Sequence, residues 1–151
     1  MTRPRILALF GTRVIFGAER ANIEALAALS EQDCEVLCLV RHESWSDHVA
    51  AALAARGLAS RKVAFIHGWL PGWRLRILFR NPIAFFVGNW CAFRIIREFQ
   101  PTHIHAFNHL YVLSFVPLLI FSRIPMIYHA GDEPTRHRWI WRVLWLSLIH
   151  I

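Results

Sequence analysis

The loop from Gly11 to Arg20 contains the residue types best suited to bind an anionic ligand. A short apolar run at 6–10 predicts a buried strand that stops at Gly11, and Gly17-Ala-Glu-Arg20 opens a predicted helix. The first N–H groups of a helix lie at its positive dipole end and bind phosphates. The two glycines would allow close approach of a ligand to the backbone, although a plain turn would also use them. The loop lacks the G-x-G-x-x-G of dinucleotide-binding folds and the Gly-Lys-Ser/Thr of a P-loop.

Polar residues also follow two later predicted strands. Asn108 follows the strand expected at 103–106, and His129 ends the strand expected at 125–129. Ligands of parallel sheets bind beyond the carboxyl ends of the strands, so we expect His129 and Gly17 at one edge. A hydrogen-bonded loop histidine is the structural alternative for His129.

An acidic pair follows His129 in the same predicted loop. Asp132 and Glu133 suit the binding of a ligand hydroxyl, and they equally suit ion pairs with Arg136 and Arg138.

Histidines and cysteines suggest a metal site at first sight. His103 and His105 share one strand face because side chains alternate along a strand, and His109 follows a turn. Zinc requires three or four converging ligands. We expect no metal site, and we expect Cys34 and Cys38 to be small, buried strand residues.

Apolar runs alternate with helical patterns along the whole chain. This alternation predicts an α/β fold, with a Rossmann-like parallel sheet sandwiched by helices and the strand order 3-2-1-4-5. The apolar runs 83–93 and 110–121 are too short to span a membrane, which favours buried helices. The predicted strands are 6–10, 35–40, 62–66, 103–106 and 125–129, and the predicted helices are 18–30, 46–56, 82–99, 110–121 and 135 onward.

The composition describes a folded, basic chain. Its 151 residues are 56% hydrophobic and carry a formal net charge of +7, and every basic residue except Lys62 is arginine. Disordered chains are far less hydrophobic. No nucleic-acid-binding module pattern is visible, so nucleic acid is not an expected partner. Three sparse cysteines and no signal peptide predict a reduced, cytoplasmic location.

A basic, aromatic segment precedes the helix expected from 82. Arginines bind lipid phosphates and tryptophans lie at head-group level, which predicts contact with an anionic membrane. A packed tryptophan loop with solvated arginines is the alternative. The residues concerned are Trp69, Trp73, Arg74, Arg76 and Arg80.

Three segments together resemble the family 4-like glycosyltransferases of the GT-B fold. Phe16-Gly-Ala-Glu-Arg20 is similar to the family's Gly-Ala-Glu-Arg signature, although Thr12-Arg13 stand where the family often has two adjacent glycines. Gln100-Pro-Thr-His-Ile-His-Ala-Phe-Asn108 is similar to its His-x-His strand, and Ile124-Pro-Met-Ile-Tyr-His129 to the end of its fifth strand. The segments follow the family's order over nearly the whole chain.

The resemblance implies the N-terminal, acceptor-side half of a GT-B fold over residues 1–145. It implies transfer of a sugar from a nucleotide-sugar donor to a hydroxyl acceptor, with retained anomeric configuration and no bound cofactor. The acceptor would be lipid-linked or part of a cell-envelope glycan, and the enzyme peripheral on the inner face of the cell membrane. The implied catalytic residue is His129, and the implied substrate or phosphate residues are Gly17, Ala18, Glu19, Arg20, Asn108 and Asp132.

The last six residues look foreign to the rest of the chain. Leu146–Ile151 match a reading-frame translation of a transposon-end adapter used in sequencing libraries. We therefore expect the natural protein to continue past Trp145 into a donor-binding domain absent here, and the fragment alone to be inactive. The alternative is a non-catalytic, basic and aromatic membrane-interface protein.

Overall fold

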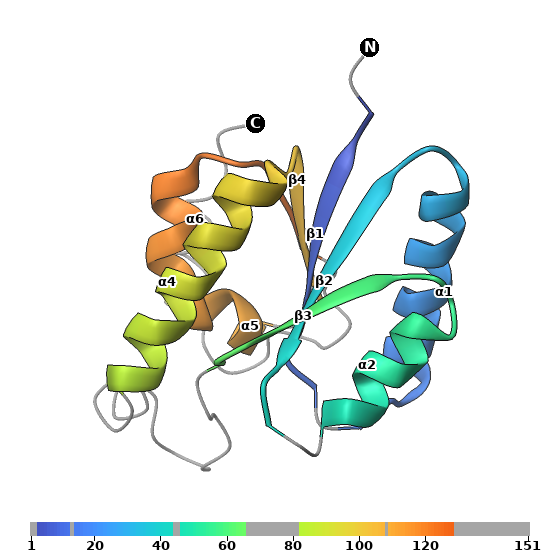
Figure 1. Cartoon of the computed structure of the whole chain (residues 1–151), viewed down its shortest axis with the longest axis horizontal. Helices are drawn as coiled ribbons and strands as arrows, with labels where there is room; N and C mark the ends of the chain where they lie inside the picture. Colours follow the sequence, from blue (N-terminus) through green and yellow to red (C-terminus); the bar gives the residue numbers. More distant parts are fainter. Residues whose placement is uncertain (1–2, 13, 44–45, 66–81, 108, 129–151) are drawn as a thin grey trace.

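A computed structural model describes residues 3–12, 14–43, 46–65, 82–107 and 109–128. In this part of the chain one five-stranded sheet lies between two helical layers (Figure 1). The strands are β1 (Arg5–Phe10), β2 (Glu35–Arg41), β3 (Ala59–Val63), β4 (His103–Ala106) and β5 (Met126–Tyr128). The helices are α1 (Gly17–Glu31) and α2 (Asp47–Ala54) on one face, and α4 (Pro82–Phe99), α5 (His109–Ser114) and α6 (Val116–Ser122) on the other.

The sheet confirms the predicted topology. Its order is β3-β2-β1-β4-β5, and every neighbouring pair is parallel. The central strand β1 supplies both cores, because successive side chains of a strand point to opposite faces. Leu7 and Leu9 pack under α4, α5 and α6, whereas Ile6, Ala8 and Phe10 pack under α1 and α2.

The predicted position of the third strand was wrong. The strand was expected at 62–66 from its apolar residues, but β3 occupies Ala59–Val63. β3 is an edge strand, and its exposed Arg61 and Lys62 form ion pairs with the helices on either side. The apolar-run rule applies to strands covered on both faces, and it fails at such an edge.

The predicted helix over 110–121 is two helices. α5 ends at Ser114, and α6 begins at Val116 after Phe115, whose backbone leaves the helical conformation. Pro117 lies in the first turn of α6, where the missing N–H removes no hydrogen bond. The proline therefore starts a new helix rather than continuing the previous one.

The expectation that the apolar run 83–93 forms a buried helix was also wrong in part. α4 buries one face, including Ala92, against the sheet. Its other face exposes Phe86, Trp90 and Phe93 to solvent. Hydrophobic content alone could not predict which face of this helix is buried, because nearly all of its residues are apolar.

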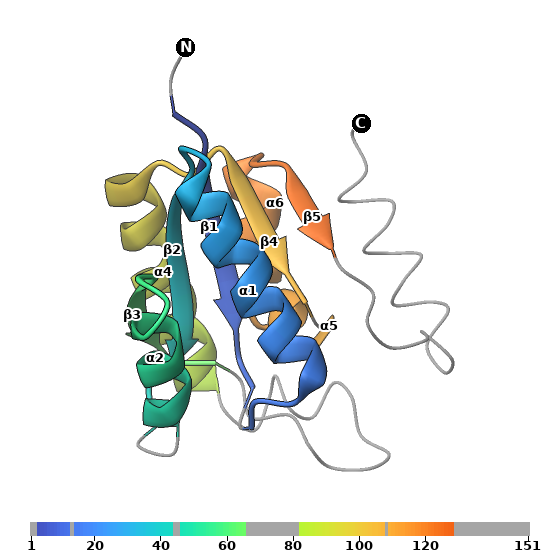
Figure 2. The same ribbon diagram turned by 90° about the vertical axis from the view of Figure 1, so that its right-hand side faces the viewer.

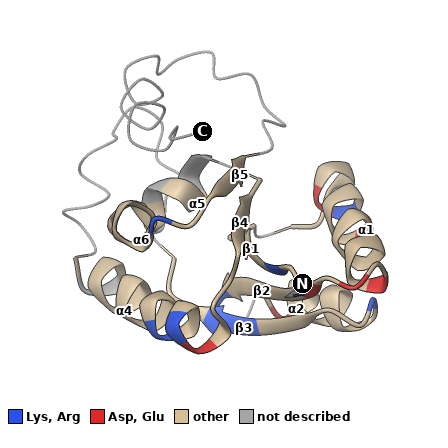
Figure 3. Ribbon diagram, turned by 90° about the horizontal axis from the view of Figure 1, so that it is seen from above, with Lys and Arg blue, Asp and Glu red and all other residues tan. Residues whose placement is uncertain are grey.

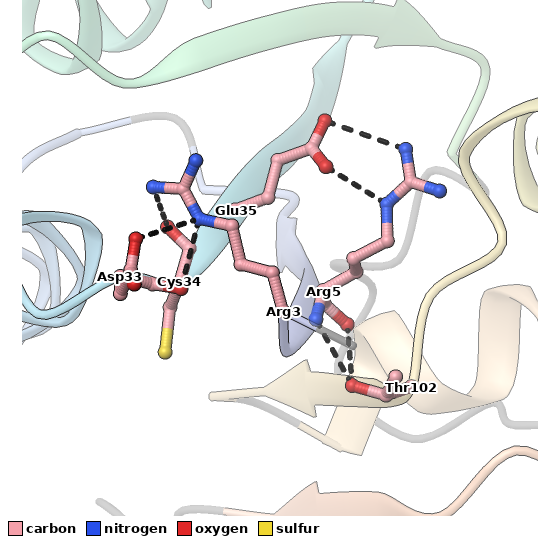
Figure 4. A network of polar contacts seen from close by, with 6 residues as sticks. All are labelled: Arg3, Arg5, Asp33, Cys34, Glu35 and Thr102. Atoms are coloured by element: carbon pink, nitrogen blue, oxygen red, sulfur yellow. Dashed lines mark hydrogen bonds and ion pairs between the residues drawn. The ribbon is translucent and has the colours of Figure 1, made fainter. Parts of the chain in front are cut away.

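A polar network joins the amino ends of three strands (Figure 4). The Arg5 N–H donates to Thr102 Oγ1 at 3.0 Å, and the Thr102 N–H donates to the Arg5 carbonyl at 2.8 Å. Arg5 Nε lies 2.8 Å from Glu35 Oε2, and Arg3 Nε donates to the Asp33 carbonyl at 2.8 Å. These contacts hold the starts of β1, β2 and β4 together, at the edge opposite the candidate site.

Candidate functional site

The candidate site is the carboxyl edge of the sheet. All five strands are parallel, so their carboxyl ends meet at one edge, and the loop after β1 leads there into α1. Figure 2 shows the strand arrows pointing toward the side where α1 begins. Ligands of open α/β sheets bind in the crevice outside this edge.

Gly11 has a packing role at this edge. A Cβ placed on Gly11 would lie 2.5 Å from two ring carbons of Tyr111 and 3.0 Å from Phe65 Cδ1. The loop after β1 therefore lies directly against the Tyr111 ring of α5. Packing, rather than approach of a ligand, accounts for this glycine.

Gly17 lies in open surroundings at the start of α1. A Cβ placed there would meet no atom within 4 Å, and both Gly17 and Ala18 are exposed. The first backbone hydrogen bond of the helix runs from the Arg20 N–H to the Phe16 carbonyl at 3.0 Å. The N–H groups before Arg20 lie ahead of that bond, where a helix offers donors to an anion.

Glu19 caps the helix that it belongs to. Its Oε2 accepts a hydrogen bond from the Phe16 N–H at 3.1 Å, while the apolar Phe16 side chain caps nothing in return. A carboxylate in the first turn stabilises a helix through the dipole, and it also competes with a bound anion. Arg20, exposed in the same turn, adds a positive charge beside it.

A buried ion pair at the carboxyl end of β2 was missed from the sequence. The side chains of Arg41 and Glu43 are only 8% and 16% exposed, with Arg41 Nε 3.1 Å from Glu43 Oε2. Arg41 Nη1 also donates to the Gly11 carbonyl at 3.5 Å, so the pair reaches the loop after β1. The buried Ser46 hydroxyl contacts the carbonyls of both Arg41 and Glu43. An arginine directly after a buried apolar strand, two residues before an acid, was the available signal.

Tyr111 brings these parts together. Its pKa is raised to about 12 by burial, while a hydrogen bond to Thr12 and the charge of Arg41 lower it and the charge of Glu19 raises it. The phenol thus lies among the loop after β1, the start of α1 and the end of β2. At neutral pH the Tyr111 phenol is protonated and hydrogen-bonded to Thr12, and it holds the loop after β1 in position.

This environment predicts an alkaline loss of stability. The folded state keeps Tyr111 protonated up to a pKa of about 12, whereas the unfolded chain ionises it near its ordinary value of 10.0. Above pH 10 the unfolded state binds fewer protons than the folded state, so the free energy of unfolding falls as pH rises. We expect Tyr111→Phe to flatten this fall, measured by urea unfolding at several pH values between 9 and 12. An unchanged slope in the variant would show that Tyr111 is not the responsible group.

Several predicted site residues lie outside the described residues. β5 is described up to Tyr128, the residue before His129, and its carboxyl end belongs to the same sheet edge as the start of α1. The predicted roles of the others stay predictions as well. They are His129, Asn108, Asp132, Trp69, Trp73, Arg74, Arg76 and Arg80.

The described residues offer no metal cluster, and Cys38 is not a reactive thiol. No group of three His, Cys, Asp or Glu side chains among them is placed to hold a metal ion. Cys38 is buried in the core under α1, and this burial raises the pKa of its thiol to about 12, which disfavours the reactive thiolate. No helix in the same part of the chain is long and apolar enough to cross a membrane.

Comparison with known proteins identifies the fold. No protein-family model and no curated protein matches the chain. The crystal structure of Acinetobacter baumannii MurG is similar, with a TM-score of 0.60 and 14% sequence identity, over 85% of this chain and 35% of the MurG chain. A Glycyrrhiza uralensis UGT73P12 structure, complexed with glycyrrhetinic acid 3-O-monoglucuronide, has a TM-score of 0.45 and 15% identity over 84% of this chain and 28% of its own. MurG is a glycosyltransferase of the GT-B fold, and the chain spans about a third of its length. The chain therefore has an α/β, Rossmann-like fold of the kind found in a GT-B glycosyltransferase.

Proposed function

We propose that residues 1–145 are the N-terminal, acceptor-side domain of a glycosyltransferase. The enzyme would transfer a sugar from a nucleotide-sugar donor to a hydroxyl acceptor. The observation that supports this most strongly is the fold. The chain has a five-stranded parallel sheet, and its structure is similar to that of MurG over 85% of its length. The sequence adds Gly17-Ala-Glu-Arg20 at the start of α1, which resembles the signature of the family 4-like enzymes.

The start of α1 suits a phosphate or hydroxyl group of the substrate. Gly17 and Ala18 are exposed and precede the first hydrogen bond of the helix. Glu19 fixes the first turn by capping Phe16, and Arg20 offers an exposed guanidinium for an oxyanion. In the proposed enzyme Asn108 and Asp132 bind substrate hydroxyls, and His129 acts on the sugar or acceptor.

The buried side chains beneath the loop suit a binding site that must stay in position. Tyr111 packs against Gly11, and Arg41 holds the Gly11 carbonyl while paired with Glu43. Binding groups work best when the residues around them lock their geometry. In the proposed enzyme a second domain holds most of the donor nucleotide, and retention of anomeric configuration is proposed from the family resemblance.

A membrane-bound or lipid-linked acceptor belongs to the same proposal. The segment with Trp69, Trp73 and Arg74 combines aromatic rings with positive charge, the pattern of a membrane-interface anchor. We propose that it lies at an anionic membrane on the cytoplasmic side, where it would bring a lipid-linked acceptor or nascent glycan to the site.

The deciding experiment is to sequence the natural gene beyond the codon for Trp145. A second βα domain with two glutamates separated by seven intervening residues supports the proposal, provided that the protein containing both domains transfers radiolabelled sugar. A stop codon, or a hydrophobic membrane span directly after Trp145, contradicts it. Proton NMR of the product then determines its anomeric configuration from the coupling of the anomeric proton.

In the enzyme with both domains, His129→Ala is expected to lower turnover by roughly 100-fold or more, as loss of a group that assists proton transfer does. The free energy of unfolding should change far less. His48→Ala is the matched control, because His48 is an exposed histidine on α2. Equal turnover in the two variants would remove His129 from the catalytic site.

A further inference from the structure

The outer face of α4 exposes aromatic side chains that no described element covers. Phe86 is 70% exposed and Trp90 64% exposed, and Phe93 also lies open to solvent. Their positions follow the i, i+4, i+7 spacing of one helical stripe. The ring centroids of Trp90 and Phe93 lie 6.2 Å apart, and the Arg97 guanidinium lies 5.9 Å from the Phe93 centroid.

The opposite face of α4 is fixed to the sheet, so the stripe cannot turn inward. Ala92, Ile95 and Phe99 belong to the core. Gly88 lies so close to the backbone just after β3 that a Cβ there would be 2.1 Å from the Ala64 carbonyl oxygen. Soluble proteins rarely expose a contiguous aromatic stripe unless it meets a partner or a membrane.

The charged residues of α4 lie together in its second half. They are Arg94, Arg97 and Glu98, and the helix before Arg94 carries no charged residue. Glu98 near the end of α4 receives two hydrogen bonds from Arg61, at 2.6 and 2.9 Å, and these hold its pKa below the ordinary value. Arg94 and Arg97 therefore give this end of α4 its net charge. Figure 3 shows the charged positions gathered at one end of α4, with the rest of the helix uncharged.

We propose that the outer face of α4, defined by Phe86, Val87, Trp90, Phe93, Arg94 and Arg97, docks the protein on an anionic phospholipid bilayer. The rings would enter the boundary between head groups and acyl chains, and the two arginines would meet lipid phosphates. Interfacial helices bind membranes through this combination of an aromatic face with flanking basic side chains.

A second copy of this chain is a poorer match for the same face. Charged groups at a protein interface need complementary groups on the partner. Six of the eight Asp and Glu residues that the structure describes already form ion pairs within the chain. A bilayer containing phosphatidylglycerol supplies the missing negative charge.

This inference extends the membrane contact proposed for Trp69 to Arg80 onto a described surface, but it does not require sugar transfer. Its test measures only vesicle binding, so failure of the transferase proposal and failure of this one remain distinguishable. The 151-residue chain is sedimented with vesicles of phosphatidylcholine, with or without phosphatidylglycerol, at low and at high salt.

Two double variants test the two parts of the surface. Arg94→Gln/Arg97→Gln is expected to weaken binding to phosphatidylglycerol vesicles about 30-fold at low salt, equivalent to about 1 kcal/mol per arginine. Phe86→Ser/Trp90→Ser is expected to weaken it roughly tenfold or more, through lost burial of apolar surface. High salt should reduce the difference made by the arginines and leave that made by the rings.

Matched controls distinguish vesicle binding through this surface from nonspecific electrostatic and hydrophobic binding. Arg3→Gln/Arg56→Gln removes the same charge from exposed ion pairs away from α4, and Phe16→Ser removes an exposed ring at the start of α1. Both should bind vesicles like the parent chain, and urea unfolding confirms that all variants fold. Equal losses in variants and controls would overturn the proposal.

Three further outcomes also contradict it. The first is strong binding by both α4 variants together with its loss in Arg74→Ala/Arg76→Ala/Arg80→Ala, which would place the contact in the preceding segment alone. The second is that the parent chain does not bind either kind of vesicle. The third is that the parent chain dimerises in analytical ultracentrifugation and Phe86→Ser/Trp90→Ser does not, which would make the face an interface between copies.

Discussion

Gly88→Ala is expected to lower the free energy of unfolding by about 3 kcal/mol, the upper part of the range for overpacking a core. The new Cβ would lie 2.1 Å from the carbonyl oxygen of Ala64, a backbone atom that cannot rotate away. α4 would have to move off the end of β3, which opens the contacts of Ala92 and Ile95 with the sheet. Urea unfolding followed by circular dichroism measures the effect.

Gly17→Ala is the control for this substitution. Gly17 has no atom within 4 Å of a built Cβ and lies in the first turn of α1. Alanine there should be neutral or should stabilise the fold by up to about 1 kcal/mol, since it reduces the entropy of the unfolded chain. If Gly88→Ala has the same urea midpoint of unfolding as the parent chain, α4 does not lie this close to the Ala64 carbonyl in solution.

The central strands could be predicted because each is marked by the residues of its own segment and the turns beside it. β1 and β2 are mainly apolar runs, and β4 alternates half-buried histidines with buried apolar residues. A parallel sheet follows from the alternation of such strands with helices. β3 was misplaced because an edge strand tolerates charged residues. The break at Phe115 was missed because the apolar pattern continues unchanged through it.

The candidate site was only half visible in the sequence. Gly17 and Glu19 belong to one contiguous segment with a recognisable pattern. Tyr111 joins them from a helix about a hundred residues later in the chain, and only the fold brings its phenol beside Thr12 and Arg41. No spacing rule links such residues, since they meet through packing across two layers.

Which face of α4 packs against the sheet could not be predicted, for a different reason. Residues 83–93 are almost uniformly apolar, so periodicity could not separate the face that packs from the face that is exposed. Gly88 and Ala92 show it in the structure, because small residues allow the helix to lie close to the sheet. The large rings of Phe86 and Trp90 are left on the opposite side.

Glu43→Gln is expected to lower the free energy of unfolding by about 3 kcal/mol, as breaking a buried ion pair does when one charge remains. Arg41 would keep its contact with the Gly11 carbonyl but lose the carboxylate that balances its buried charge. Amide hydrogen exchange should accelerate in the loop after β1, which Arg41 holds from below. The measurements are urea unfolding and exchange followed by mass spectrometry.

An exposed ion pair supplies the comparison that identifies burial as the cause. Arg56 and Glu24 are each about half exposed, at 53% and 51%, so Glu24→Gln should cost less than about 1 kcal/mol and leave the loop after β1 unaffected. Replacing both members of the buried pair, as in Arg41→Leu/Glu43→Leu, should cost less than the sum of the two single changes, because no uncompensated charge remains. Equal effects of Glu43→Gln and Glu24→Gln would mean that Arg41 is hydrated in solution. The loop before α1 would then be held mainly by its packing against Tyr111 and Phe65.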